Sequence, residues 1–420
     1  MAALLQSILF GRRRRMTIAR PKRTRHVGDQ PGLEALESRV VLAADDVLVG
    51  LANHRVILTM DPVGAAITDL ATAYDEPAAR LTITAASAGT LAMAAPVDGL
   101  SVDAAANTIT VDLKKITKFA GISVVGGSNA DTVTIGPGGV NLAVIGRGAA
   151  AQGFSINTGE GAADRITVAG QIVAKGAGGV TLTTLGEGVA NGILLESNVV
   201  TSKGSQSFGG GVTLLDDVAL RAGRDISFSS TVDGFGRLSL SARRTITMSA
   251  DVGSLLPLQG ITLTKASRVN VGGGLVLDGS GAVAGTSGLV IGVNVDNVVF
   301  GPTVGARRIS GFGGAGIRFL GGSVGSLITG VTSTGNGTGL LVGSGTYRGT
   351  VISGSSFADN VGDGVSLHSA RDLALGGRAP GSGNEILANG GFGVASVGGC
   401  AGSLVVGCEI GANALGQVKN

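Results

Sequence analysis

The stretch Leu375–Val394, LGGRAPGSGNEILANGGFGV, decides the fold of this chain. Glycine-rich turns surround one short apolar run in it. A helix cannot hold so many glycines, because each Gly in a helix interior costs about 1 kcal/mol relative to Ala. Short strands separated by tight turns can hold them. We therefore expect this stretch to form one coil of a parallel β-helix, and the chain to be mostly a stack of similar coils.

The composition of the whole chain also favours many short strands. Of the 420 residues, 74 are Gly, 9 are Pro and none is Trp. A collagen triple helix is excluded, because Gly does not recur at every third position and Pro is too scarce. Disorder of the body is not expected, since 44% of the residues are apolar and only 15% are charged. The predicted fold class is therefore all-β.

The basic residues gather at the start of the chain. Residues 1–45 hold nine Arg or Lys and four acids, out of totals of 32 and 29, which leaves 23 bases and 25 acids for residues 46–420. The body thus has a net charge of −2 and lacks the basic surface that nucleic-acid binding needs. The apolar run before Arg12 is too short to cross a bilayer, so no transmembrane span is expected.

The segment LEALESRVVLAAD, residues 33–45, carries a recognisable pattern. It resembles the N-terminal sorting segment of planctomycete-type bacterial surface proteins, Leu-Glu-x-Leu-Glu-Pro-Arg-x-Leu-Leu-Ser/Ala-Ala, with Ser38 in place of the Pro. This resemblance implies export and cleavage. The alternative is an amphipathic helix after a basic tail that binds nucleic acid or anionic lipid; either way, residues 1–45 are expected to be a disordered or partly helical leader. The matching residues are Leu33, Glu34, Leu36, Glu37, Arg39, Leu42 and Ala44.

Residues 46–150 alternate as strands do and are expected to form the first coils or a cap. Period-2 or fully apolar runs occur at 79–86, 107–113, 121–127 and 131–136, bounded by Gly, Asn and Asp. The run GGSNADTVTIG around Asp131 resembles a calcium-binding nonapeptide, but the second Gly-x-Asp set is missing. A turn role for Asp131 is the favoured interpretation.

Residues 151–420 are expected to form the parallel β-helix itself. Apolar residues alternate in pairs such as Ile226 and Phe228, or Leu238 and Leu240. The passages VTSKGSQSFGGGVTL and AGRDISFSSTVDG resemble the repeats of filamentous-haemagglutinin-like adhesins. That resemblance implies a right-handed parallel β-helix, of the kind that pectate-lyase-like proteins also contain.

The repeat is clearest after residue 300. A Gly followed by an apolar strand occurs at Gly316, Gly339, Gly364 and Gly393, with spacings of 23, 25 and 29 residues. A period of 20–30 residues with short strands indicates a solenoid. A second strand recurs as Ile-Ser/Thr-Gly, and three of the Gly strands follow an Asn, which suits a ladder of amides between coils. The positions are Ile309, Ile328 and Ile352 for the second strand, and Asn336, Asn360 and Asn389 for the ladder.

The opening stretch and the residues after it resemble a bacterial surface repeat of the form Ile-Gly-Gly-Thr-x-x-Gly-x-Gly-Asn-x-Ile-x-x-Asn-Gly-Gly-x-Gly-Val, followed later by Asn-x-Ile-Gly. Leu375 replaces the first Ile and Cys408 stands at the later Asn. Because 405–420 stops within a repeat, we expect either that a partner covers this end or that the chain continues in a longer parent.

Strand alternation predicts which side chains face the core. Three pairs are expected to stack as apolar columns, and the residues between them are expected to face outward. The inward pairs are Ile317 with Phe319, Leu340 with Val342, and Val365 with Leu367; the outward residues are Arg318, Leu341, Ser366 and Ala395.

The candidates for chemistry are few. One coil carries acids beside a base and a histidine, the types that polysaccharide lyases and hydrolases of this fold need; turn-forming Asp on a solvated face is the favoured interpretation. No metal or cofactor site is expected, since the histidines are far apart in sequence. We expect Cys400 and Cys408 to be two small, buried side chains, and a disulfide between them is the alternative. The candidate catalytic residues are Asp359, Asp363, His368, Arg371 and Asp372.

The expectation that follows is a non-catalytic, exported, structural or adhesin-like β-solenoid at a bacterial cell surface or outside the cell. Its expected partners are cell-envelope components, extracellular polysaccharide or other surface proteins, with no nucleic acid. The rival hypothesis is a carbohydrate-active β-helix enzyme, and a third is a basic-tailed intracellular protein.

Overall fold

The computed structural model describes residues 47–60, 66–87, 89–116, 118–145, 152–186, 190–301 and 305–411. These residues fall within one compact unit, Leu42–Asn420. The leader expected at residues 1–45, with the sorting segment predicted at 33–45, lies outside the described residues.

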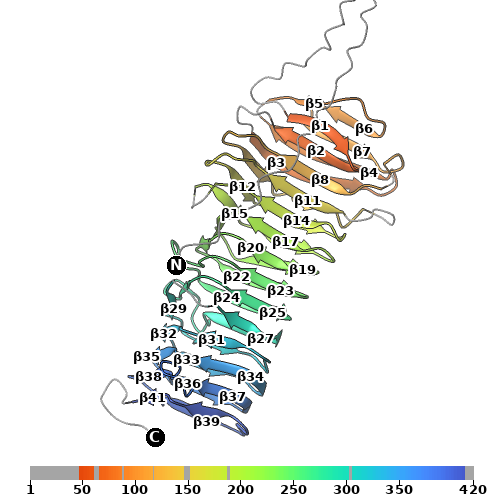
Figure 1. Ribbon diagram of the computed structural model, residues 1–420. Coiled ribbons are helices and arrows are strands. Elements are labelled where there is room, and N and C mark those ends of the chain that lie inside the picture. The colour runs from red at the N-terminus through yellow and green to blue at the C-terminus, as the bar shows by residue number, and fades with distance from the viewer. Residues whose placement is uncertain are drawn as a thin grey trace, which may run out of the picture. The chain divides into compact units, whose positions relative to one another are not determined.

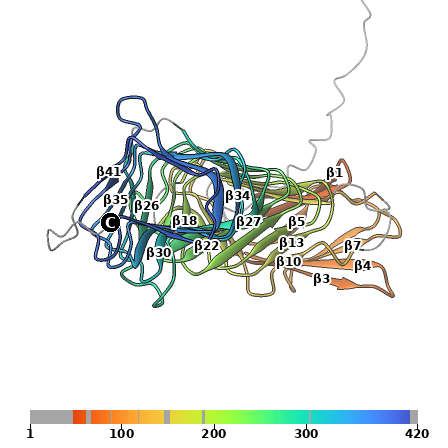
Figure 2. The ribbon, with the colours of Figure 1, turned by 90° about the horizontal axis from the view of Figure 1, so that it is seen from below.

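The described chain is a β-solenoid, as the glycine-rich repeats predicted. Successive coils lie one on another (Figures 1 and 2). From β11 onward each full coil supplies one strand to each of three sides, except that the coil of β23 and β24 has only a bridge at Val252 on the third side. Strands on each side pair in parallel with those of the neighbouring coils, and within the described ranges no helix occurs. The all-β, parallel-solenoid fold class is therefore confirmed.

The first side is a 15-stranded sheet, here called the long sheet. Its pairing is parallel from β2 to β40. In sequence order its strands are β1 (Val47–Ala52), β2 (Arg55–Met60), β5 (Leu91–Met93), β8 (Gly121–Val125), β11 (Gly153–Asn157), β14 (Gly179–Thr183), β17 (Gln206–Gly209), β20 (Ile226–Phe228), β23 (Thr245–Met248), β25 (Arg268–Val271), β28 (Val298–Phe300), β31 (Leu327–Thr329), β34 (Gly345–Ser353), β37 (Ala370–Gly376) and β40 (Leu404–Val406).

The second side is an 11-stranded parallel sheet, here called the middle sheet. Its strands are β10 (Val140–Asn141), β13 (Ile172–Ala174), β16 (Val199–Thr201), β19 (Val218–Ala222), β22 (Arg237–Ala242), β24 (Gly260–Ala266), β27 (Leu289–Val295), β30 (Ala315–Phe319), β33 (Thr338–Val342), β36 (Val365–His368) and β39 (Val394–Val397).

The third side consists of a nine-stranded and a six-stranded sheet. Val252 joins them, because it bridges to Val232 on one side and to Leu275 on the other. The nine strands are β3 (Ala66–Asp75), β4 (Arg80–Ser87), β6 (Leu100–Asp103), β7 (Thr108–Asp112), β9 (Thr132–Ile135), β12 (Arg165–Val168), β15 (Gly192–Leu195), β18 (Val212–Leu214) and β21 (Val232–Gly234). The six are β26 (Leu275–Asp278), β29 (Arg307–Ser310), β32 (Thr332–Thr334), β35 (Ser356–Ala358), β38 (Glu385–Ile386) and β41 (Glu409–Ile410).

Antiparallel strands lie beyond the first coils. β4 pairs antiparallel with β3 and β7, and β6 with β7, while β1 pairs antiparallel with β2. The parallel stacking starts where β2 meets β8 and β3 meets β9. Residues 46–150 therefore hold both antiparallel strands and the first parallel strands, and β8 pairs with β11 across residue 150.

The predicted apolar columns lie in the core. β30, β33 and β36 pair so that Ile317, Leu340 and Val365 are in register, and all three side chains are fully buried. Their partners two residues on form the next column. Ser366, expected to face outward, is buried, and its hydroxyl is hydrogen-bonded to the His368 ring at 3.1 Å.

The predicted alignment of the Ile-Ser/Thr-Gly strands is wrong for one of its three members. Ile328 and Ile352 do pair, in the long sheet, but Ile309 lies in β29 on the third side and pairs with Ser333. The motifs look alike because each ends at a corner where a glycine has positive φ, 77° at Gly311 and 67° at Gly330. Gly adopts such a backbone without the steric cost that a Cβ brings.

Candidate functional site

A ladder of three buried asparagines runs along the corner between the third side and the middle sheet. Asn336, Asn360 and Asn389 are each at most 2% exposed. The Asn360 amide nitrogen donates to Asn389 Oδ1 at 3.0 Å and to the Ser333 carbonyl at 3.1 Å. Asn336 makes the matching bonds to Asn360 Oδ1, at 3.3 Å, and to the Ile309 carbonyl. The predicted amide ladder is thus present.

The glycines near the start of β33 and β36 make room for this ladder. A Cβ on Gly364 would lie 2.5 Å from Asn389 Nδ2, and a Cβ on Gly339 would lie 2.8 Å from Asn360 Nδ2. Each glycine is therefore needed by the asparagine of the following coil. The Asn and Gly of the repeat belong to one packing unit that spans two coils.

A second column occupies the corner between the long sheet and the third side. The Ser355 main-chain N–H donates to Asn384 Oδ1 at 3.0 Å, and Asn384 Nδ2 lies 3.8 Å from the Cys408 sulfur. Cys408 thus continues the Asn384 column, as its place in the repeat suggested. Cys400 and Cys408 are both free thiols and half-buried, so the pairing alternative is not realised.

Two of the five candidate catalytic residues hold corners. Asp359 and Asp372 have φ values of 53° and 58°, a conformation that Asp adopts more readily than most residues. Asp359 stands where Gly335 and Ala388, also with positive φ, stand in the adjacent coils. A Cβ on Gly402 would lie 2.2 Å from Asp372 Oδ1, so Asp372 packs against the next coil.

The other three candidates have different surroundings. Asp363 Oδ1 accepts the Phe392 main-chain N–H at 2.8 Å, which ties two coils together. His368 is exposed and contacts Ser366. Arg371 is exposed, and no ion pair of Arg371 occurs among the described residues.

The structure places these candidates at two separate corners of one coil. Asp359 and Asp363 precede β36, whereas His368 ends it and Arg371 and Asp372 follow in β37. The four residues of β36 span about 13 Å at 3.3 Å per residue. Asp359 and Asp363 share one corner, and the His368, Arg371 and Asp372 group lies at the other.

Asp131, the calcium candidate, is a buried turn residue. Its Oδ2 accepts the Gly127 main-chain N–H at 2.6 Å, and its own N–H donates to Asp164 Oδ1 in the next coil at 2.8 Å. Across the part of the chain that the structure describes, His, Cys, Asp and Glu side chains form no group of three that could hold a metal ion.

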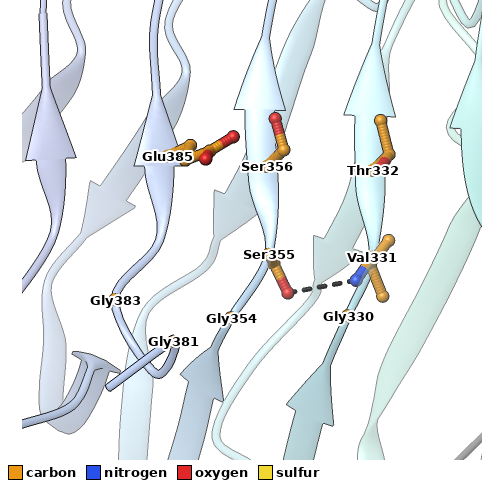
Figure 3. Close-up of a pocket in the computed structure, with 9 residues that line it drawn as sticks. All are labelled: Gly330, Val331, Thr332, Gly354, Ser355, Ser356, Gly381, Gly383 and Glu385. Atoms are coloured by element: carbon orange, nitrogen blue, oxygen red, sulfur yellow. Dashed lines mark hydrogen bonds between the residues drawn. The ribbon is translucent and has the colours of Figure 1, made fainter. Parts of the chain in front are cut away.

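A hollow that sequence reasoning missed opens at the corner between the long sheet and the third side. It has a volume of about 280 Å³ and its rim carries Thr332, Ser356 and Glu385, which are in register on β32, β35 and β38 (Figure 3). Its floor is Gly330, Gly354 and the Ser355 hydroxyl, which accepts the Val331 N–H at 3.2 Å. The signal that could have found Glu385 is its place between the buried Asn384 and Ile386, which turns it outward.

No family model, no curated protein and no solved structure matches this chain. Among the described residues, none lies in a helix long and apolar enough to cross a membrane.

Proposed function

We propose that this chain is an exported, non-catalytic β-solenoid at a bacterial cell surface, with a structural or adhesin-like role. The observation that carries the proposal is the buried ladder of Asn336, Asn360 and Asn389. These asparagines are the most regular residues of the repeat, and their side chains hold neighbouring coils together. The resemblance of residues 33–45 to a planctomycete-type sorting segment supports the export.

The acids of the candidate coil also favour a structural role. Asp359 and Asp372 occupy left-handed corners, and Asp363 binds a main-chain N–H of the next coil. A catalytic acid or base must instead be free to reach a substrate proton. The backbone conformation at Asp359 and Asp372 and the hydrogen bond of Asp363 therefore support a structural interpretation of these residues.

The adhesive surface of this proposal is the hollow beside β32, β35 and β38. Its rim offers the hydroxyls of Thr332 and Ser356 and the carboxylate of Glu385, with glycines below that leave the backbone accessible. Hydroxyl and carboxylate groups suit the hydroxyl-rich surface of an extracellular polysaccharide. Repetition along the coils matches a repeating polymer better than a small molecule.

Fractionation of the native host, with N-terminal sequencing of the mature protein, tests the proposal. We expect the protein in the envelope or medium, cleaved near Ala44, and an Arg39→Glu variant retained inside the cell. An uncleaved chain in the cytoplasm would overturn the export, and turnover of a polysaccharide by the purified protein would overturn the non-catalytic role.

The enzyme alternative has one observation in its favour. Glu385 and Glu409 are exposed and in register on adjacent strands, so their Cα atoms lie about 4.8 Å apart. Retaining glycosidases use two nearby carboxyl groups for catalysis. Hydrolysis of a glycan panel, abolished in Glu385→Gln and unchanged in Glu196→Gln, would establish this alternative in place of the adhesin-like role.

A further inference from the structure

The outer face of the long sheet changes character along its length. One outward-facing position recurs in register from β8 to β40. In the first seven strands it is polar, and in the last five it is apolar. The polar residues are Ser123, Ser155, Thr181, Ser207, Ser227, Thr247 and Asn270; the apolar residues, here called the apolar stripe, are Val299, Leu327, Val351, Ala374 and Leu404.

The apolar stripe is open to solvent. Leu327 is 41% exposed and Leu404 is 59% exposed, and the other three members are half-buried. The outward position two residues further along each strand is uncharged on all five coils, as Gly301, Thr329, Ser353, Gly376 and Val406 show. Two uncharged rows thus run side by side over five coils, about 19 Å from the first to the last.

We propose that the apolar stripe is the contact between two copies of this chain, packed face to face with their coils running in opposite directions. An apolar row repeated every 4.8 Å along a sheet is best matched by another row with the same repeat. A second copy supplies such a row, and a two-fold axis makes one face complementary to itself.

Charges beside the stripe set the alignment. Asp296, Arg348 and Arg371 each lie three residues before the stripe residue of their coil. A two-fold axis between the coils of β31 and β34 places Asp296 on the same flank as Arg371 of the second copy. The same axis sets Leu327 opposite Val351 and Val299 opposite Ala374 of the second copy, and it keeps the two Arg348 side chains off each other. Four of the five stripe residues thus meet one another, and Leu404 lies opposite Asn270 of the second copy.

The size of the stripe sets the expected strength of the dimer. Four coils that meet stripe to stripe, with two narrow rows, bury less than the roughly 800 Å² per partner of a standard interface. The dimer is therefore expected to be weak, with a dissociation constant on the order of micromolar, and to depend on protein concentration.

Sedimentation velocity of the full chain over about 1–200 μM tests this inference, because the range brackets a micromolar constant. Dimer is expected in the wild type, and Leu327→Lys should weaken it at least about tenfold, since it buries a charge against an apolar row. Ser227→Lys, at the equivalent position in the polar part of the same sheet, should leave the dimer intact.

A charge exchange checks the alignment without touching the stripe. Asp296→Arg and Arg371→Asp should each weaken the dimer, and the double variant should restore it. Circular dichroism on every variant confirms that the fold is kept. A wild type that stays monomeric at 200 μM, equal effects of Leu327→Lys and Ser227→Lys, or a double variant no better than the singles would each overturn the proposal.

Discussion

Asn389 Oδ1 accepts two hydrogen bonds from Asn360, one from its main-chain N–H and one from its side-chain amide, both at 3.0 Å. One oxygen thus fixes both the backbone and the side chain of the residue one coil before it. Asn336 donates to Asn360 Oδ1 in the same two ways, so each coil is held by the one that follows.

Asn360→Ala is expected to destabilise the coils around it more than an ordinary polar deletion. It leaves the buried Asn336 main-chain N–H without an acceptor, and a buried group left in this way costs about 1–3 kcal/mol. It also removes one acceptor of the Asn336 amide, which keeps the Ile309 carbonyl and the Ser333 hydroxyl. The free energy of unfolding should fall by about 3 kcal/mol, as measured by urea denaturation. In hydrogen exchange, the Asn336 amide should lose protection while amides in β14 keep theirs. The half-buried Asn270→Ala serves as the control, and equal losses from both variants would contradict the ladder.

Gly364→Ala is expected to be destabilising although alanine is the smallest possible change. Its Cβ would lie 2.5 Å from both Asn389 Nδ2 and Ile386 Cγ2, so the ladder must shift. Overpacking of this kind costs about 1–3 kcal/mol. Gly399→Ala is the matched control, because a Cβ there meets no atom within 4 Å. The unfolding temperatures of both variants test this prediction. An unchanged unfolding temperature for Gly364→Ala would show that the corner shifts to accommodate the added Cβ without loss of stability.

Tyr347→Phe is expected to lower stability by about 1 kcal/mol, because the buried hydroxyl donates to the Gly343 carbonyl at 2.7 Å. The ring should stay in place against Phe319, whose centroid lies 5.6 Å away. Urea denaturation of the variant at neutral pH measures this loss. An unchanged midpoint would mean that the hydroxyl bond adds nothing to the fold.

The same tyrosine predicts a loss of stability at alkaline pH. Burial raises the pKa of Tyr347 above the ordinary value of about 10. The folded state therefore holds its proton when the unfolded state has lost it, so stability is complete below about pH 10 and falls as the pH rises further. The free energy of unfolding of the wild type and of Tyr347→Phe is measured between about pH 8 and 11, a range that spans the ordinary tyrosine pKa. It should fall more steeply with pH in the wild type.

Substitutions at Asp363 test whether its carboxylate has a structural role. Asp363→Asn keeps an oxygen for the Phe392 N–H, whereas Asp363→Ala removes it. Because this hydrogen bond is exposed, we expect a loss of only about 1 kcal/mol for the Ala variant and little change for the Asn variant. Hydrogen exchange at Phe392 measures the difference. If both variants exchange at the same rate, the carboxylate does not hold the coil.

Much of this arrangement could be predicted from sequence, because the solenoid turns a spatial neighbour into a residue about one coil away in the chain. The register of Leu340 with Val365 and the ladder from Asn336 to Asn389 both follow from spacing alone. The Ile309 strand was misplaced because two different corners end in the same kind of glycine turn.

Features that depend on several coils at once could not be predicted. The change from Ser227 to Leu327 on one outward position appears only when every register is known, since coil length varies from 20 residues between Gln206 and Ile226 to 32 between Gly121 and Gly153. Glu385 belongs to the hollow for the same reason, because its neighbours Ser356 and Thr332 come from other coils.

The antiparallel strands beside the first coils also bear on how the chain folds. β3 and β4 meet through a short connection, and closing a short loop costs little conformational entropy. Their pairing supplies a ready edge, and each later coil needs only its predecessor as a template. Folding can therefore start at these antiparallel strands and proceed in one direction, coil by coil. An interruption at one coil then leaves the earlier coils already formed.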